Sequence, residues 1–312
     1  MVSKVVLLLA GLLFLAEGSA QVDSSFVETF ASTTRVNGGL RFRDNSASFS
    51  VGSRETLKLN NRGLALRLGG RYKWVGYTFS IPLSDLGTDS ELGEAKSLGV
   101  NIQFYRDKFY LNANLRRTTG FERESSGEET VFRDDIRFFN ALLFGFRILN
   151  NRQFSLRSSF KLRNRQLRSS GSLLLGGVIH RQILTADSLT LPLRGTGTTT
   201  IDRFSQTKLG VGLGYAHTFV FGKLFFATPL LIAGPEVRFI DYDQTDGSRE
   251  IERLRVSPRI RGRLALGANG RRNYAALAGS YLPSADATDN LNTRVDEIQL
   301  ELIIGHRIGI DN

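Results

Sequence analysis

Basic side chains at even spacings are the residues of this sequence best placed to do chemistry together. In a β-strand the side chains alternate between two faces, so residues two or four apart share a face. The basic residues that share single parities in this way are Arg67, Arg71, Arg157, Lys161, Arg255, Arg259, Arg261 and Arg263. A low-dielectric passage lined by such groups attracts anions, and we interpret the set as a basic ladder along a lumen that favours a small anionic solute.

Catalytic and metal chemistry have little support in the sequence. The 312 residues include no cysteine and three histidines, His180, His217 and His306, which are scattered along the chain. None of the three is followed by a serine two residues later, which is the arrangement in the serine phospholipases of twelve-stranded barrels. Scattered histidines without cysteine also make a poor zinc site. We therefore expect no catalytic residue, no metal, no cofactor and no enzyme activity.

The first twenty residues have the pattern of an export signal. Lys4 precedes an apolar run over 5–16, and small residues come just before position 21. The run is shorter than the roughly 20 residues that a membrane-spanning helix needs. We expect residues 1–20 to be a signal peptide, 21–34 to be a short periplasmic segment and 35–312 to form the folded domain.

The remainder of the chain alternates with a period of two. From 62 to 74 the leucines fall on one parity, and the basic residues Arg67 and Arg71 fall on the other. The alternation returns near 154–163 and 254–266. Helical periodicity does not persist for three turns anywhere after the export signal. The chain is therefore predicted to be all-β.

The long alternating segments favour a transmembrane barrel over a soluble sandwich. They exceed the roughly 5 to 6 residues of an average soluble strand and reach the roughly 9 to 11 that a tilted membrane strand needs. Aromatic residues gather where these segments end, as in the interfacial girdles of membrane barrels. The expected membrane-interface aromatics are Tyr72, Trp74, Tyr77 and Phe219.

Turn lengths predict about twelve antiparallel strands. Short turns alternate with long polar loops, as on the two sides of a membrane barrel, and single-chain barrels normally have an even count. Fourteen strands is the next most favoured count, if the segment 49–59 also pairs. The predicted strands lie near 35–43, 62–74, 75–83, 94–105, 108–117, 135–149, 152–163, 202–220, 223–239, 252–268, 272–282 and 294–309.

One segment does not fit this alternation. Counting the apolar stretch 173–184 as a strand would make the total odd, so we assign 164–200 to a long insert that carries its own hairpin or plug. Small residues in the insert are unusual for a solvated loop and are expected to fold against the wall or into the barrel mouth. These insert residues are Ser170, Gly171, Gly176 and Gly177.

Four stretches resemble landmarks of one protein family. They are GGRYKWVG at 69–76, ILNNRQFS at 148–155, SGSLLLGG at 170–177 and GYAHTF at 214–219. The family consists of exported Gram-negative proteins whose function is unknown, and it is regarded as a family of outer-membrane barrels. The resemblance covers about residues 24–309 and implies the barrel fold, but it implies no catalytic or ligand-binding residue.

Three functions remain open at this stage. The first is a narrow or gated anion-favouring pore, or a ligand-binding barrel, and the formal net charge of +11 agrees with it. The second is a non-conducting structural or surface-interaction barrel whose basic residues are held in salt bridges. The third is an outer-membrane enzyme that acts on lipid. In each case we expect the Gram-negative outer membrane as the location, with lipid, lipopolysaccharide and the barrel-assembly machinery as partners and no nucleic acid.

Overall fold

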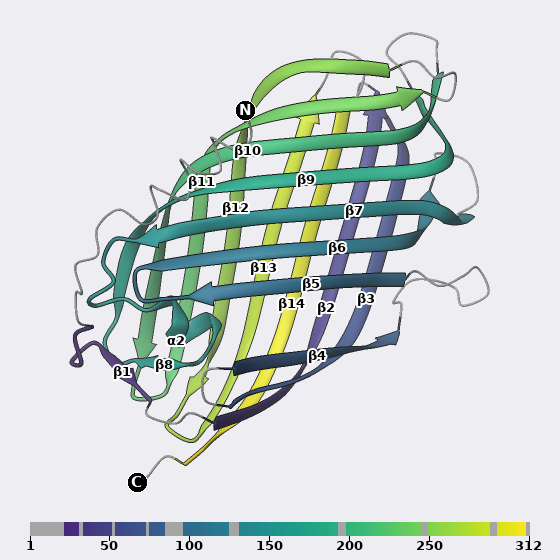
Figure 1. Ribbon diagram of the computed structural model, residues 1–312. Helices are drawn as coiled ribbons and strands as arrows, with labels where there is room; N and C mark the ends of the chain where they lie inside the picture. The colour runs from purple at the N-terminus through teal and green to yellow at the C-terminus, as the bar shows by residue number, and fades with distance from the viewer. Residues whose placement is uncertain are drawn as a thin grey trace.

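The chain folds as an antiparallel β-barrel of the outer-membrane type (Figure 1). The computed structural model describes residues 22–30, 34–51, 54–72, 75–84, 96–124, 131–192, 198–244, 249–287 and 292–309. Within these ranges the regular structure is strand except for one short helix, α2 (Leu156–Phe160). No helix in this part of the chain has the length and apolarity to cross a membrane. The signal peptide predicted at 1–20 lies outside the described residues.

Twelve strands form the main sheet, and two short strands form a separate pair near one end. The main sheet contains β2 (Thr34–Val51), β3 (Arg54–Tyr72), β4 (Val75–Ser84), β5 (Lys96–Tyr105), β6 (Phe109–Glu124), β7 (Val131–Ile148), β9 (Ser170–Pro192), β10 (Thr198–Phe221), β11 (Phe225–Gln244), β12 (Arg249–Asn269), β13 (Asn273–Ala287) and β14 (Asn292–Ile308). The separate pair joins β1 (Val27–Thr29) to β8 (Asn164–Gln166). The N-terminal segment thus folds back onto the connection between β7 and β9.

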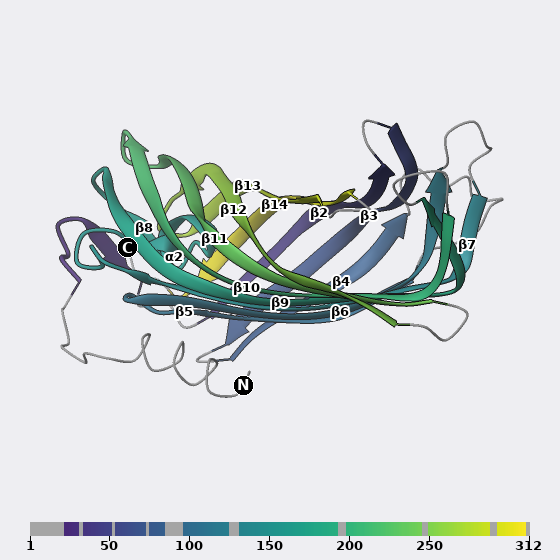
Figure 2. The same cartoon turned by 90° about the horizontal axis from the view of Figure 1, so that it is seen from above.

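Ten of the twelve strands close the barrel. The order runs from β3 through β2, β14, β13, β12, β11, β10, β9 and β7 to β6, and β6 pairs with β3 over Lys58–Asn60. Strands β4 and β5 extend the sheet at the edges of this closure, where β4 pairs with β3 and β5 pairs with β6. Seen from above, β9 and β10 lie across the interior from β13, β14 and β2 (Figure 2).

The predicted count of twelve is confirmed, but the membership of the set differs. Residues 152–163, predicted as a wall strand, hold α2 and lie inside the barrel. Residues 164–200, predicted as a long insert, instead contain β9, which pairs with β7 on one side and β10 on the other. One predicted wall strand is absent and one unpredicted wall strand is present, so the number of strands in the main sheet is still twelve. The segment 49–59 adds no further strands, because it forms the paired outer ends of β2 and β3.

The physical reason for the exchange lies in the side chains of 154–162. Phe154, Leu156, Phe160 and Leu162 alternate with polar residues, which satisfies the rule for a lipid-facing strand. In the folded chain these four side chains are buried inside the barrel. Alternation identifies two unlike faces, but it does not say whether lipid or a protein interior covers the apolar one.

The two faces of the wall differ as the alternation predicted. The outward side chains include many exposed apolar residues, such as Leu68, Leu213, Leu231, Val256 and Ile304. Such an apolar outer band is the surface that a barrel presents to lipid. The inward side chains pack into two apolar clusters at opposite ends, with polar and charged residues between them.

Candidate functional site

Most of the predicted basic ladder does lie in the interior of the barrel. Arg67 on β3 forms an ion pair with Glu301 of β14, and Arg259 on β12 forms one with Glu236 of β11. Arg261 and Arg263, which share the inward parity of Arg259 on β12, contact aromatic rings. Arg71 and Arg255 belong to β3 and β12, but their side chains are not among those that the structure describes.

Two members of the predicted ladder are not on the wall. Arg157 lies in α2, and Lys161 is the residue directly after the end of this helix. Arg157 donates a hydrogen bond of 3.0 Å from its guanidinium to the carboxylate of Asp107, in the turn between β5 and β6. The backbone carbonyl of Lys161 accepts a hydrogen bond of 2.7 Å from Arg35 of β2. Both basic residues therefore belong to a segment that fills the mouth of the barrel.

A charged belt runs along the inner wall over the three neighbouring strands β10, β11 and β12. Lys208 on β10 pairs in register with Arg238 on β11, and both side chains are buried. Buried Glu236 accepts from Arg238 at 3.0 Å and also from Arg259. The ladder prediction omitted Lys208, Glu236 and Arg238. The signal for them was available, because Lys208 alternates with Leu209 on β10, and Glu236 and Arg238 alternate with Val237 and Phe239 on β11.

A second charged group lies on β14 and the strands around it. Glu301 is paired with Arg41 at 3.6 Å and with Arg67, and Glu297 is paired with Arg116 of β6 at 3.5 Å. Since β6 and β14 are not neighbours in the sheet, the pair between Arg116 and Glu297 spans the interior. The lumen is narrow enough for side chains from opposite walls to meet.

Arginine–aromatic contacts also cross the lumen. The guanidinium of Arg261 on β12 lies 4.0 Å from the ring centroid of Phe144 on β7, and that of Arg263 lies 4.2 Å from the ring of Phe160 in α2. Inward glycines, including Gly210 and Gly212 on β10, leave space around Phe144, and the cavity that remains there measures ≈ 40 Å³. Side chains therefore fill this level of the barrel.

Basic residues outnumber acidic residues on the inward face. Described inward carboxylates at these levels of the wall are those of Glu236, Glu297 and Glu301. The inward cations of the same levels are Arg41, Arg43, Arg67, Arg116, Lys208, Arg238, Arg259, Arg261 and Arg263. A buried carboxylate can pair with two of these groups, but three carboxylates do not neutralise the set. The interior therefore carries a strongly positive potential.

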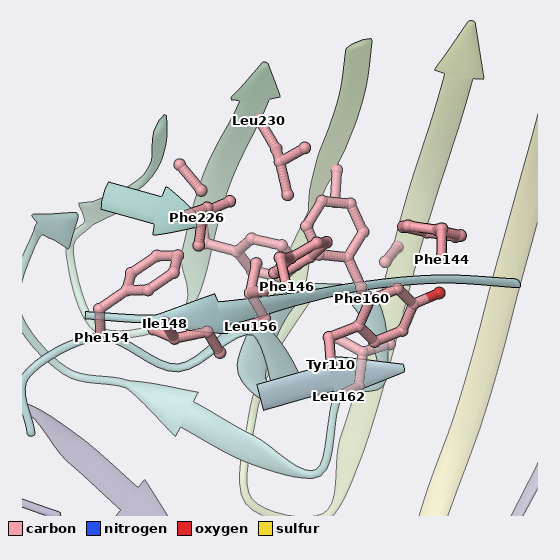
Figure 3. Close-up of a cluster of buried hydrophobic side chains, with 14 of the residues drawn as sticks. Tyr110, Phe144, Phe146, Ile148, Phe154, Leu156, Phe160, Leu162, Phe226 and Leu230 are labelled. Carbon is pink, nitrogen blue, oxygen red and sulfur yellow. The ribbon is translucent and has the colours of Figure 1, made fainter. Parts of the chain in front are cut away.

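The segment that connects β7 to β9, residues 149–169, forms a plug in the mouth on the side of the short turns. Phe154, Leu156, Phe160 and Leu162 of the plug pack with Tyr110, Phe144 and Phe146 of the wall in one apolar cluster (Figure 3). The rings of Tyr110 and Phe144 meet edge-on, with centroids 5.2 Å apart. This cluster closes the mouth without any covalent link to the wall on the opposite side.

Hydrogen bonds from three wall strands hold the plug backbone. Arg307 on β14 donates to the carbonyl of Leu162 at 2.5 Å. Asn269 on β12 donates to the carbonyls of Ser158 at 3.0 Å and Asn164 at 2.8 Å. The hydroxyls of Ser159 and of Thr228 on β11 are 2.6 Å apart. The bonds from Arg307 and Asn269 satisfy backbone oxygens of the plug, as a stable interior requires.

The N-terminal segment and one strained residue complete the plug. Glu28 of β1 pairs with Arg165 at 2.6 Å and with Arg271 at 3.0 Å, which ties the segment to the turn between β12 and β13. Leu162, just after α2, has φ 52, a left-handed conformation that a non-glycine residue adopts at some cost. Burial in the plug, together with the nearby cations Arg67, Arg163 and others, lowers the pKa of the Lys161 ammonium well below its ordinary value.

The three histidines occupy separate places. His180 on β9 points inward, and its imidazole lies 2.7 Å from the side-chain oxygen of Asn140 on β7. His217 contacts the Tyr215 hydroxyl at 3.0 Å, and His306 contacts Asn273 at 2.7 Å, near the short turns. The structure brings none of the three together.

A family comparison places the chain. The family described as "Domain of unknown function (DUF4421)" matches residues 21–300. The chain belongs to this family. The resemblance read from the sequence is thereby confirmed, and the family description assigns no activity. None of the curated proteins compared with the chain matches it.

Several solved barrels are similar to this DUF4421 member at low identity. The transport unit of the autotransporter AIDA-I from Escherichia coli is 14% identical, with 97% of each chain covered and a TM-score of 0.40. The β domain of the Bordetella autotransporter BrkA is 14% identical, covers 87% of this chain and 99% of its own, and has a TM-score of 0.38. The outer membrane protein OprG from Pseudomonas aeruginosa is 8% identical, with coverages of 90% and 98% and a TM-score of 0.24. These likenesses say nothing of what the present protein binds.

One predicted interface aromatic of the DUF4421 chain can be located. Phe219 is 45% exposed on the outward face of β10, beside the Phe221-Gly222 turn, where its ring lies 4.4 Å from that of His217. Tyr72 and Tyr77 lie at the ends of β3 and β4, although their side chains are not described. Trp74 is outside the described residues. The insert residues Ser170, Gly171, Gly176 and Gly177 are wall residues of β9, which corrects their assignment to a plug.

Proposed function

We propose that the protein is a plugged outer-membrane barrel that admits small anionic solutes through a gated passage. The exposed apolar side chains of the outer face support a location in lipid, where outer-membrane lipid and lipopolysaccharide surround the wall and the barrel-assembly machinery inserts it. Heat-modifiable migration of the mature protein in the outer-membrane fraction tests the location. Recovery as a soluble periplasmic protein would contradict it.

The observation that carries the proposal is the excess of inward cations over carboxylates. Buried charges are normally compensated, because an isolated ion loses its hydration in a low-dielectric interior. An interior in which Arg41, Arg43 and Arg261 share few carboxylates is stabilised by an anion that enters it. The same potential repels small cations. The passage therefore discriminates by charge.

The plug supplies the gate. Its contacts with the wall are hydrogen bonds and apolar packing, which can open without breaking a covalent bond. The cysteine-free sequence allows a direct test. The Ser159 and Thr228 hydroxyls are 2.6 Å apart, so the double variant Ser159→Cys, Thr228→Cys is placed to form a disulfide between plug and wall.

The test measures single-channel currents of this double variant in planar bilayers. We expect no channel current while the disulfide is formed and anion-selective openings after its reduction. In a potassium chloride gradient the reversal potential should then lie close to the equilibrium potential of chloride. Replacing Arg259, Arg261 and Arg263 by Gln should remove most of the anion preference. The single variant Ser159→Cys is the control for redox effects that are unrelated to the lock. Cation-selective openings would contradict the proposal.

A non-conducting barrel is the second candidate. The specific observation in its favour is the filled interior, in which Lys208, Glu236 and Arg238 are almost fully buried and the cavity beside Phe144 measures ≈ 40 Å³. On this alternative the charges hold the wall together and the outer loops carry the function. Complete electrical silence after reduction of the lock, and also after replacement of 153–167 by a short linker, would favour it.

A further inference from the structure

The wall of the barrel is split between β12 and β13. These strands pair over only eight residue pairs, from Gly262 with Tyr281 to Asn269 with Tyr274. Beyond this ladder β12 continues to Arg249 while paired with β11, and β13 continues to Ala287 while paired with β14. In both views the outer end of β12 bends away from β13 (Figures 1 and 2). The outer part of this side wall is therefore open.

Two prolines explain where the ladder stops. Pro258 lies four residues beyond Gly262 on β12, and Pro283 lies two residues beyond Tyr281 on β13. Proline has no backbone N–H to donate, so within sheets it is confined to edges and irregularities. With one on each facing edge, a continued ladder would lose donors from both strands. The split is thus encoded in the sequence.

The split begins at the level of the lipid. Gly262 is seven residues from the end of β12 at Asn269, roughly 24 Å along the strand. With the usual strand tilt of 35–45°, this distance along β12 places Gly262 below the top of an apolar band that is about 25 Å tall. Beyond it the outward side chains Val256 and Ile260 are 67% and 48% exposed. In hydrocarbon, strand edges without partners are tolerated only where they line a cavity.

A cavity of ≈ 660 Å³ occupies this place and is lined from both faces of the wall. Leu264, Ile298 and Leu300 contribute from the outward face. Leu230 and Arg263 contribute from the inward face. An intact ladder keeps the two faces apart, so a single cavity lined by both requires the split. Its volume is in the range of sites that hold one small-molecule ligand.

The lining changes from apolar to cationic along its depth. The outer rim carries two carboxylates, and each is paired with an arginine: Asp44 with Arg62 at 3.1 Å and Asp296 with Arg294 at 2.6 Å. The rim is therefore close to neutral. Behind it lie Arg263 and the positive interior. Gly262, at the last rung of the ladder, leaves open space where a side chain would stand.

We propose that the cleft between β12 and β13 binds a single-chain anionic amphiphile that enters sideways from the membrane. Its hydrocarbon chain lies against Leu264, Ile298 and Leu300, and its carboxylate or similar head group reaches Arg263. The preference for an anionic head rests on the cationic interior of the proposed function, whereas the lateral route rests on the strand pairing alone.

Quenching by bromine tests the site, since bromine on a lipid chain quenches tryptophan fluorescence on contact. In a Trp74→Phe background, which removes the one native tryptophan, Leu230→Trp places a reporter on the inward lining of the cleft. Phe226→Trp, also inward on β11 and in the same apolar cluster as Leu230 but not part of the cleft lining, is the matched control. The probes are dibromostearate and the neutral dibromostearyl alcohol, added to the protein in nanodiscs.

We expect dibromostearate to quench the Leu230→Trp reporter saturably and to leave the Phe226→Trp reporter unchanged. Gly262→Phe should abolish the effect by filling the cleft, and Arg263→Gln should weaken the apparent affinity about tenfold. Calorimetric titration of the otherwise unaltered chain and of Gly262→Phe with oleate provides the same comparison without a reporter. Binding of oleate that Gly262→Phe does not change would overturn the proposal, as would equal quenching by the alcohol.

The result separates the two proposals. Saturable quenching in a protein that stays electrically silent with the plug released supports the lateral site and contradicts the gated passage. Anion-selective currents without saturable quenching support the passage and overturn the lateral site.

Discussion

The two halves of β12 differ in how they pair and in what their inward side chains contact. From Gly262 to Asn269 the strand pairs on both sides, and its inward residues Ala265 and Asn269 are buried against the plug. From Arg249 to Arg261 it pairs with β11 alone, and its described inward side chains contact charged groups and a ring of the lumen. The ladder between β12 and β13 is intact beside the plug cluster, and it ends near Arg259 and Arg261, where charged side chains of β12 face the lumen.

The plug stabilises the side wall as well as the mouth. Asn269, at the end of β12, donates to two plug carbonyls, and Arg307 on β14 donates to a third. The plug thus joins β12 to β14 across β13 in the part of the wall where the ladder is intact. Arg263 stands at the boundary, since it lines the lateral cleft and also lies over the Phe160 ring of the plug. Through Arg263 we expect occupancy of the proposed cleft to be coupled to the position of the plug.

Deletions should give the largest contrast between wall and plug. Removing 170–192 takes out β9 and leaves one edge of β7 and one edge of β10 without a partner in lipid, so we expect no heat-resistant, detergent-folded species. Replacing 153–167 by a short linker removes plug residues only, and a folded barrel should persist. Mobility on unheated gels measures both. A folded barrel without 170–192 would show that β9 is not an obligatory wall strand.

Arg307 gives the next largest effect. Its guanidinium donates to the carbonyls of Leu162, Gly270 and Arg271 and to the side chain of Asn269. Arg307→Ala leaves the buried acceptors of Leu162 and Asn269 without this donor, and we expect a loss of about 2 to 4 kcal/mol in the free energy of unfolding. Urea unfolding in lipid vesicles measures it. Arg272→Ala, at an exposed position in the nearby turn, should change the value by less than about 0.5 kcal/mol.

Local patterns predicted the sheet well and the plug badly, for identifiable reasons. Period-two alternation is set by strand geometry, so β3 and β12 were found from residues such as Leu64 and Leu264 alone. The plug is stabilised by contacts between distant segments, such as Phe160 with Arg263, and no local pattern contains such pairs. Parity could have added Lys208 and Arg238 to the basic set. Pro258 and Pro283 also carried a local signal for the split.

Replacing these two prolines tests whether they keep the wall open between β12 and β13. Pro258→Val with Pro283→Val restores two backbone donors on facing edges, so we expect the ladder between β12 and β13 to lengthen. The gain in stability should be about 1 to 2 kcal/mol, since each added hydrogen bond contributes roughly 0.5 to 1.5 kcal/mol net. Slower amide hydrogen exchange at 259–261 reports the closure. Pro229→Val, in β11 beside the intact ladder, is the control. If it slowed amide exchange in the same segment of β12 as much as the double variant does, the interpretation would be contradicted.

The smallest expected effect concerns the charge of Lys161 in the plug. Burial, with Arg67, Arg163 and Arg35 nearby, lowers the pKa of its ammonium below the ordinary 10.5. Between the lowered pKa and 10.5 the unfolded chain binds more protons than the folded chain, so folding is favoured increasingly as pH rises through this window. Lys161→Met should remove that pH dependence and raise the free energy of unfolding at neutral pH by about 1 kcal/mol, because no charge is then buried. Urea midpoints between pH 7 and 10 measure the slope, with Lys223→Met in an exposed turn as the control. An unchanged slope in Lys161→Met would show that the plug tolerates the charged ammonium as well as the neutral side chain.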